Sequence, residues 1–220
     1  MMKVFTRKEI LPISLIALAY IIGVSCYSCL PEMMPAHWNY HGEVDDWSSK
    51  NFTIFFFPSL ALSIYLLMLF IPKIDPLRKN YPKFSLSYFW FRVILVLFFV
   101  SLYLYTLAAG AGFKMNINYF IVPLISLLFI FIGLFLPKIK KNYFVGIRTP
   151  WTIHSEEVWD KTHKMAGRLF VGAGIISLFS LFFPDYAFQI FMASVLAAAL
   201  GSIVYSYFIF RKNGEFNKES

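Results

Sequence analysis

The feature that most constrains this chain is a set of apolar runs that are long enough to cross a lipid bilayer. A helix needs about 20 residues to cross the hydrocarbon core, because each residue rises about 1.5 Å across a thickness near 30 Å. Residues 10–29, 52–71 and 117–136 have this length and contain no charged residue. Hydrophobic residues make up 59% of the 220-residue chain, more than is usual in soluble domains. The sequence therefore predicts an integral membrane protein.

Three further runs complete a predicted bundle of six spans. Residues 86–109 are interrupted by Arg92, whose long side chain we expect to reach the lipid headgroups. Residues 169–183 are short for a span, but the segment from Ser155 has a helical pattern and can lead straight into them. Residues 186–210 form the last span. The predicted fold class is all-α: a polytopic membrane protein with a six-transmembrane-helix bundle.

Lysine and arginine residues are distributed unevenly between successive connections. They cluster near both termini and in residues 72–85 and 137–168, whereas the other two connections contain only Lys50 and Lys114. Cytoplasmic loops of membrane proteins carry the excess of basic residues. We therefore expect a multi-pass protein of the cell membrane with both termini in the cytoplasm. This topology also accounts for most of the net charge of +8 without a direct nucleic-acid partner.

The two longest connections contain most of the patterned polar residues of the chain. We divide the sequence into a two-span domain (residues 1–83), a central two-span hairpin (84–136), and a segment with an amphipathic helix and the last two spans (137–220). Functional residues concentrate on loops that a rigid scaffold positions. The candidate sites are therefore the predicted outer connection, called here the 30–51 loop, and the predicted inner connection, called the 137–167 loop.

The 30–51 loop is predicted to form an ordered extracytoplasmic cap. Pro31 and Pro35 restrict their neighbours to extended or turn conformations, and Gly42 can adopt a positive φ. The loop contains four carboxylates and a single lysine, so an acidic surface is expected that attracts a cationic or amphipathic peptide. The carboxylates belong to Glu32, Glu43, Asp45 and Asp46.

His37, His41 and Asp45 are spaced four residues apart, and three interpretations of this spacing are open. With the nearby carboxylates they could hold a divalent metal, although Gly42 and the prolines argue against a regular helix that would align them. Alternatively, His37 and Asn39 have a hydrogen-bonded structural role, or the loop contacts a partner. We expect no cofactor, no bound metal and no catalytic residue.

The 137–167 loop combines a basic stretch with a predicted helix. The basic residues suit an anionic inner leaflet. Gly146 and Pro150 predict a turn, and Ser155, which precedes two glutamates, predicts a helix N-cap. Apolar residues then recur at helical spacing. This pattern indicates a cytoplasmic amphipathic helix that lies along the membrane before it turns into the fifth span.

Two functions other than peptide binding at the 30–51 loop are compatible with the sequence. An enzyme could use His154, Glu156, Glu157 and His163 as general acids and bases, or a metal held by the 30–51 loop. The sequence contains no HExxH, nucleophile elbow or phosphate loop, so we expect no enzymatic activity. A small transporter is the second alternative, but apart from Arg92 the predicted spans contain no ionisable residue of the kind that lines transport pathways.

The residues of the two loops fall into two longer patterns. The first resembles the P-x-H-aromatic-N-x-x-G-x-x-D signature of a small N-terminal membrane domain and is formed by Pro35, His37, Trp38, Asn39, Gly42 and Asp45. The second is formed by Gly146, Arg148, Thr149, Pro150, Trp151, Thr152, Ser155, Glu157, Trp159, Thr162 and His163. It resembles the motif G-(I/V)-(R/K)-T-P-W-T-L-x-S-x-E-x-W-x-x-T-H of the SdpI family of bacterial immunity proteins. Ile153 replaces the commoner leucine, and His154 occupies a variable position.

The resemblance covers nearly the whole chain, including the order and number of spans. It implies a bacterial membrane protein that protects the producing cell against a secreted peptide toxin of the sporulation-delaying type, which collapses the proton-motive force. It also implies a second role, in which the protein holds a cytoplasmic autorepressor at the membrane. The expected partners are thus the toxin, the bilayer and the autorepressor, and no particular oligomeric state is predicted. The residues of the first pattern would contact the toxin or support the structure of the loop. The residues of the second pattern would take part in signalling to the autorepressor.

Overall fold

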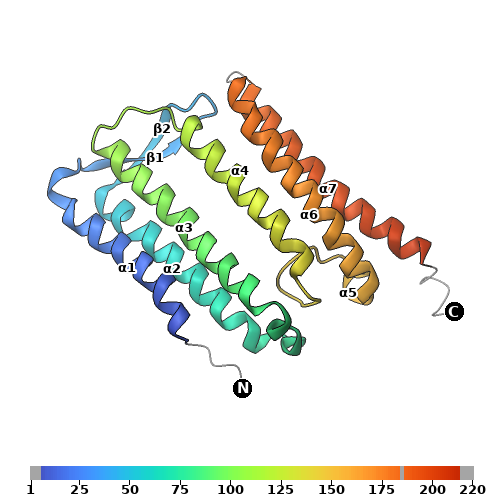
Figure 1. The fold of residues 1–220 in the computed structure, drawn as a ribbon. Coiled ribbons are helices and arrows are strands. Elements are labelled where there is room, and N and C mark those ends of the chain that lie inside the picture. Colours follow the sequence, from blue (N-terminus) through green and yellow to red (C-terminus); the bar gives the residue numbers. More distant parts are fainter. Residues whose placement is uncertain (1–5, 184–185, 214–220) are drawn as a thin grey trace. The chain divides into compact units, whose positions relative to one another are not determined.

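The computed structural model describes residues 6–183 and 186–213, which are mostly helical (Figure 1). Among the described residues, six helices are long and apolar enough to cross a membrane, so the prediction of a six-span membrane protein is confirmed. The α-helical parts of these six spans are α1 (Ile10–Ser25), α2 (Lys50–Ile74), α3 (Ser85–Gly110), α4 (Asn118–Phe135), α6 (Glu156–Phe179) and α7 (Ala187–Lys212). Short 3-10 helices are η1 (Arg7–Glu9), η2 (Tyr27–Cys29), η3 (Arg78–Phe84), η4 (Leu136–Lys138) and η5 (Ser180–Phe182). Lys3 and Lys218, two of the cations near the termini, lie outside the described residues.

The 30–51 loop is ordered, as expected, but it folds as a β-hairpin rather than as turns alone. Strands β1 (Met33–Trp38) and β2 (Val44–Ser49) pair antiparallel, with Pro35 opposite Trp47. Proline disfavours helix in the residue before it, which suits extended structure here. Two strands are marginally stable alone, so the hairpin depends on the helices beneath it.

The described residues group into two compact units. The first unit contains residues 6–70 and Arg92–Ile121, and the second contains Ile71–Phe91, 122–183 and 186–213. The division of the sequence into three segments stays a prediction.

In the first unit, α1, α2 and α3 lie side by side, with the hairpin at the end where α1 stops and α2 begins (Figure 1). One buried cluster lies at this end and comprises Ala19, Leu30, Met34, Ile54, Tyr103 and Leu107. Because Met34 belongs to β1 and is fully buried, it fastens the hairpin to the helices. A second cluster lies further along them and comprises Ile16, Ala61, Tyr65, Leu69 and Val96.

Arg92 was expected to extend its side chain to the lipid headgroups, but it is buried and paired within the first unit. Its Nη2 lies 2.9 Å from Oε1 of Glu9, and both side chains are less than one-tenth exposed. The hydroxyl of Tyr65 donates a hydrogen bond to Oε2 of Glu9 at 2.7 Å. A buried cation requires a partner because its desolvation is costly. The glutamate that supplies it lies 83 positions away in the sequence.

In the second unit, α6 and α7 run as an antiparallel pair, and α5 (Pro150–His154) precedes α6 (Figure 1). Helix α4 packs closely against α6. A Cβ atom at Gly133 would lie 2.6 Å from the carbonyl oxygen of Gly167, so both positions are at a backbone contact. Glycines allow this close approach of helices in lipid.

Helix α6 contains the predicted amphipathic segment, but the segment and the fifth span form one continuous helix. The Ser155 hydroxyl accepts a hydrogen bond from the N–H of Val158 at 3.4 Å, which confirms the predicted N-cap. The helix then runs from Glu156 to Phe179 without the turn that we expected. Val158 and Trp159 are completely buried, so its first turns pack against protein and need not lie along the bilayer.

Candidate functional site

The tip of the hairpin is shaped by Asn39 and Gly42. The Asn39 Oδ1 atom accepts hydrogen bonds from the backbone N–H groups of His41 and Glu43, at 2.9 and 3.1 Å. Its Nδ2 atom donates to Oε2 of Glu43 at 3.1 Å. Gly42 has a φ of 82°, a conformation that other residues disfavour. The side chain of Asn39 thus organises the turn that Gly42 permits.

Two asparagines in the chain between α3 and the start of α4 hold this tip in place. Asn116 Nδ2 donates to the carbonyl oxygen of His41 at 2.9 Å, and Asn118 Nδ2 donates to that of Tyr40 at 3.0 Å. A Cβ atom at Gly42 would collide with the Asn116 side chain. Neither asparagine was identified from the sequence, because contacts between residues 75 and 78 positions apart leave no local pattern.

The first strand of the hairpin is anchored by its apolar residues. Pro35 is buried, and the Trp38 ring packs edge-on against Tyr105 with 5.8 Å between centroids. These contacts fix the strand on the end of the helices. The signature residues Pro35 and Trp38 therefore lie beneath the surface that the rest of the loop presents.

The candidate metal ligands are only partly brought together. His37 Nδ1 lies 2.6 Å from Oδ1 of Asp45, across the two strands. The His41 ring instead contacts the ring of Tyr40, with 3.8 Å between centroids. Within residues 6–183 and 186–213 there is no group of three or more His, Cys, Asp or Glu residues that could hold a metal ion.

The surface of the hairpin is acidic and carries exposed aromatic rings. Lys50 forms an ion pair with Glu32 at 2.8 Å, but its own side chain is only 8% exposed. The rings of Tyr40 and Trp47 are 60% and 51% exposed. The four exposed carboxylates belong to Glu32, Glu43, Asp45 and Asp46. This surface, called the acidic hairpin face, combines negative charge with apolar contact area.

In the second unit, a buried carboxylate ties the chain after α2 to the 137–167 loop. Asp75 is 1% exposed. Its Oδ2 atom accepts hydrogen bonds from the Tyr81 hydroxyl at 2.9 Å and from the N–H of Tyr143 at 3.0 Å. Its Oδ1 atom accepts one from the N–H of Leu77 at 2.6 Å. Asp75 was not identified from the sequence because it lies outside both loops.

Asn142, also buried, shapes the turn that leads into the family-like motif. Its Oδ1 atom accepts hydrogen bonds from the N–H groups of Phe144 and Val145, at 2.9 and 2.7 Å. Its Nδ2 atom donates to the carbonyl oxygens of Lys140 and Val145, both at 3.0 Å. The basic stretch is therefore folded onto the second unit rather than free.

Trp159 and His163 form the buried centre of the motif, with rings stacked at 4.1 Å between centroids. The Trp159 indole N–H donates to the carbonyl oxygen of Ile139 at 2.9 Å. His163 Nδ1 lies 2.8 Å from the carbonyl oxygen of Trp159, and Nε2 accepts the N–H of Ile147 at 3.0 Å. Gly146 has a φ of 107°, and a Cβ atom there would collide with the imidazole. Both nitrogens of His163 are thus used in holding this turn.

The Thr-Pro-Trp-Thr part of the motif begins α5 with a reciprocal cap. The N–H of Thr152 donates to Oγ1 of Thr149 at 3.2 Å, and the N–H of Thr149 donates to Oγ1 of Thr152 at 2.9 Å. Pro150 follows the cap, where its missing N–H and fixed φ are favourable. The Thr149 hydroxyl also lies 3.2 Å from that of Ser206, which links the motif to α7.

Three other motif residues, Arg148, Trp151 and Glu157, lie nearer the surface, whereas Thr162 is completely buried. Arg148 Nη1 donates to the carbonyl oxygen of Tyr143 at 2.7 Å. The Trp151 ring contacts Tyr207, with 5.4 Å between centroids. Glu157 forms an ion pair with the lysine four residues later at 2.5 Å. The two faces of this motif therefore differ: one is locked into the unit, and the other exposes charge.

These features define a polytopic membrane protein that carries structured loops on apolar helices. A model of the SdpI/YfhL protein family matches residues 138–206, and a model of a domain of unknown function (DUF1648) matches residues 14–62. Immunity protein SdpI of Bacillus subtilis (strain 168) is 30% identical over 207 residues, which cover 94% of this chain and 97% of that protein. The chain belongs to the SdpI family. No solved structure matches it.

Proposed function

We propose that this chain confers immunity on a bacterial cell against a secreted, membrane-active peptide toxin. The observation that carries this proposal is its 30% identity, over nearly the full length of both chains, to a protein named for immunity. Relatedness over the full length includes both loops, and it supports a shared activity better than a match to one segment does.

The proposal includes a topology in which both termini are cytoplasmic and the 30–51 loop is outside. The uneven distribution of lysine and arginine between alternate connections supports this orientation. The acidic hairpin face would then meet peptides that approach from outside. A cationic or amphipathic toxin would be attracted to it before close contact forms.

The rigidity of the hairpin supports a role in recognition. Its turn is held by the side chains of Asn39, Asn116 and Asn118, and Met34 fixes it in the core. A preorganised surface loses less conformational entropy on binding. The exposed rings of Tyr40 and Trp47 would supply apolar contacts to the peptide.

The test is to express the chain in toxin-sensitive cells and to measure survival and membrane potential during exposure to the peptide. We expect protection by the unmodified chain. The double variant Glu43→Gln/Asp46→Asn removes two charges and retains the oxygen acceptors of both side chains. We expect the toxin concentration that the cells survive to fall roughly 3- to 10-fold, with a smaller effect at high salt.

The matched control is Glu215→Gln/Glu219→Gln, which changes the net charge equally at positions of the sequence outside both candidate loops. It should leave survival unchanged. If cells that express the unmodified chain are killed as readily as cells without it, at verified membrane expression, the immunity proposal is wrong. If both double variants protect cells fully, protection against the toxin does not depend on the charge of the acidic hairpin face.

We further propose that the 137–167 loop reports toxin binding to a cytoplasmic autorepressor. The exposed charges at the start of α6 support this role, because they lie on the surface of the unit while Trp159 and His163 are buried and hold the turn at Gly146. Signalling requires that the toxin bind two arrangements of the loop with different affinity. We expect added toxin to change hydrogen exchange at the backbone amides of residues 144–149. Unchanged exchange at saturating toxin would contradict this role.

A further inference from the structure

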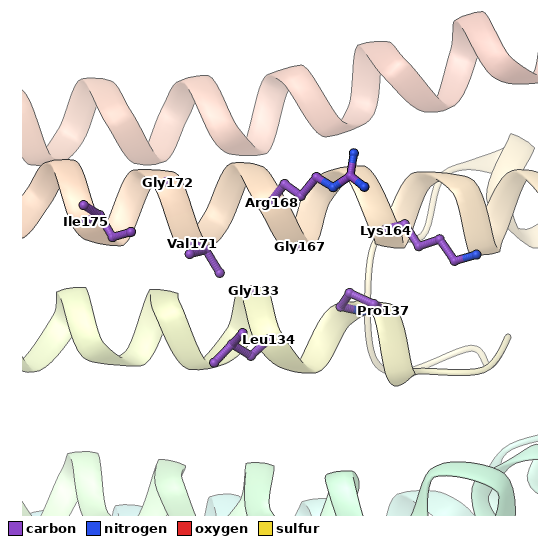
Figure 2. Close-up of a pocket in the computed structure, with 9 residues that line it drawn as sticks. All are labelled: Gly133, Leu134, Pro137, Lys164, Gly167, Arg168, Val171, Gly172 and Ile175. Carbon is purple, nitrogen blue, oxygen red and sulfur yellow. The ribbon is translucent and has the colours of Figure 1, made fainter.

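A groove of about 580 Å³ lies between α4 and α6 in the second unit (Figure 2). Ligand sites in proteins have volumes of about 300–1,000 Å³. Lys164 and Arg168 lie toward one end, and Gly172 and Ile175 lie toward the other (Figure 2). Leu134 contributes an apolar side chain from α4. The groove is thus cationic at one end and apolar along the rest.

The glycines that border this groove have different roles. Gly133 and Gly167 allow the two backbones to approach, since a Cβ atom at either would collide with the other helix. Gly172 has no such role, because a Cβ atom there would meet no protein atom within 4 Å. Helix packing therefore accounts for the first two glycines. The missing side chain at Gly172 leaves space in the wall of the groove.

The two cations of the groove have no partner among the described residues. Lys164 and Arg168 are exposed, and across the described part of the chain neither forms a hydrogen bond or an ion pair. Their neighbours differ, since Lys161 pairs with Glu157 and Lys140 pairs with Asp160. Within residues 6–183 and 186–213, no carboxylate neutralises the positive charge of the groove.

The cations lie at the level where the helices pass from polar to apolar sequence. The uncharged run of α6 begins directly after Arg168, and the span based on α4 ends at Lys138. This boundary is where the phosphates of a bilayer lie. Ile175 is seven residues beyond Arg168, or about 10 Å deeper along the helix.

We propose that this groove binds an anionic phospholipid. The lipid phosphate lies between Lys164 and Arg168, and an acyl chain follows the groove past Gly172 toward Ile175. Basic pockets between membrane helices suit anionic headgroups. A cationic peptide is disfavoured at this end by charge. The site is separate from the proposed toxin-facing hairpin and does not depend on the immunity proposal.

The experiment measures the lipid retained by the purified chain. The protein is placed in phosphatidylcholine nanodiscs that contain a minor fraction of phosphatidylglycerol, extracted into mild detergent, and examined by native mass spectrometry. We expect selective retention of phosphatidylglycerol by the unmodified chain. Lys164→Gln/Arg168→Gln is expected to lower that retention roughly tenfold, because each cation contributes to headgroup attraction. Gly172→Leu should lower it also, by filling the groove.

Two control variants match these changes elsewhere on the surface. Arg211→Gln/Lys212→Gln removes the same charge from the end of α7, and Ala197→Leu adds the same kind of apolar bulk at an exposed position. Both should retain phosphatidylglycerol normally. Equal retention by all variants would overturn the proposal. Displacement of the lipid by inorganic phosphate alone would assign the groove to free phosphate and overturn the proposal. A dimer that Gly172→Leu dissociates, with lipid retention unchanged, would assign the groove to a second copy of the chain and also overturn the proposal.

Discussion

Replacing Arg92 by leucine is expected to lower the free energy of unfolding by about 3–5 kcal/mol, because it leaves the Glu9 carboxylate buried without its cation. Glu9 is 5% exposed and Arg92 is 7% exposed, so water replaces the lost partner poorly. The Tyr65 hydroxyl satisfies the other carboxylate oxygen and cannot neutralise the charge. The ion pair also joins the start of the first span to the third, so its loss should loosen the first unit.

The free energy of unfolding can be measured by denaturant titration in mixed micelles. The double variant Glu9→Gln/Arg92→Leu should recover most of the loss, since it removes both charges and keeps an acceptor for the Tyr65 hydroxyl. Arg211→Leu provides the matched control, because that arginine is exposed on α7. A loss from Arg92→Leu no larger than that from Arg211→Leu would show that Glu9 and Arg92 are not a buried pair.

Replacing Trp159 by alanine is expected to lower the free energy of unfolding by about 3–5 kcal/mol, as large-to-small changes in packed cores do. Trp159 is completely buried. It stacks on His163, and its indole N–H satisfies the carbonyl oxygen of Ile139. The change therefore leaves a cavity and removes the donor to a buried acceptor. It also removes the ring that stacks on the His163 imidazole, which holds the turn at Gly146.

Trp159→Phe separates these two contributions. It keeps most of the apolar volume and removes the donor, so its effect should be about 1–3 kcal/mol, the cost of an unsatisfied buried group. Trp47→Ala is the control, because that ring is 51% exposed on the hairpin and should change stability by less than about 1 kcal/mol. Unfolding of Trp159→Ala and Trp47→Ala at the same denaturant concentration would contradict the buried packing of Trp159.

Arg92 illustrates where sequence reasoning about membrane proteins stops. Apolar length correctly located the third span, because lipid requires a continuous uncharged run. The same reasoning placed Arg92 at the headgroups, since a single arginine in a span usually reaches water. Its actual partner, Glu9, lies just before the first apolar run, and no local pattern connects the two. The pairing follows from the way helices assemble.

The candidate loops show the same division between local and tertiary information. Pro35 and Gly42 indicated an ordered loop, and Ser155 indicated a helix start. The strand pairing of the hairpin depends on residues outside the loop, including Asn116. Likewise, the resemblance to a family identified His163 and Trp159 as motif residues, but it did not predict that both are buried.

The sequence by itself determined that this chain spans a membrane, how many times it does so, and which loops distinguish its family. These properties depend on runs of adjacent residues, because the bilayer selects continuous apolar segments and families keep local motifs. Only the tertiary structure decided that Arg92 is paired with Glu9, that Asp75 supports the 137–167 loop, and that Lys164 and Arg168 border an open groove. These depend on contacts between distant residues, and such contacts exist only after the helices pack.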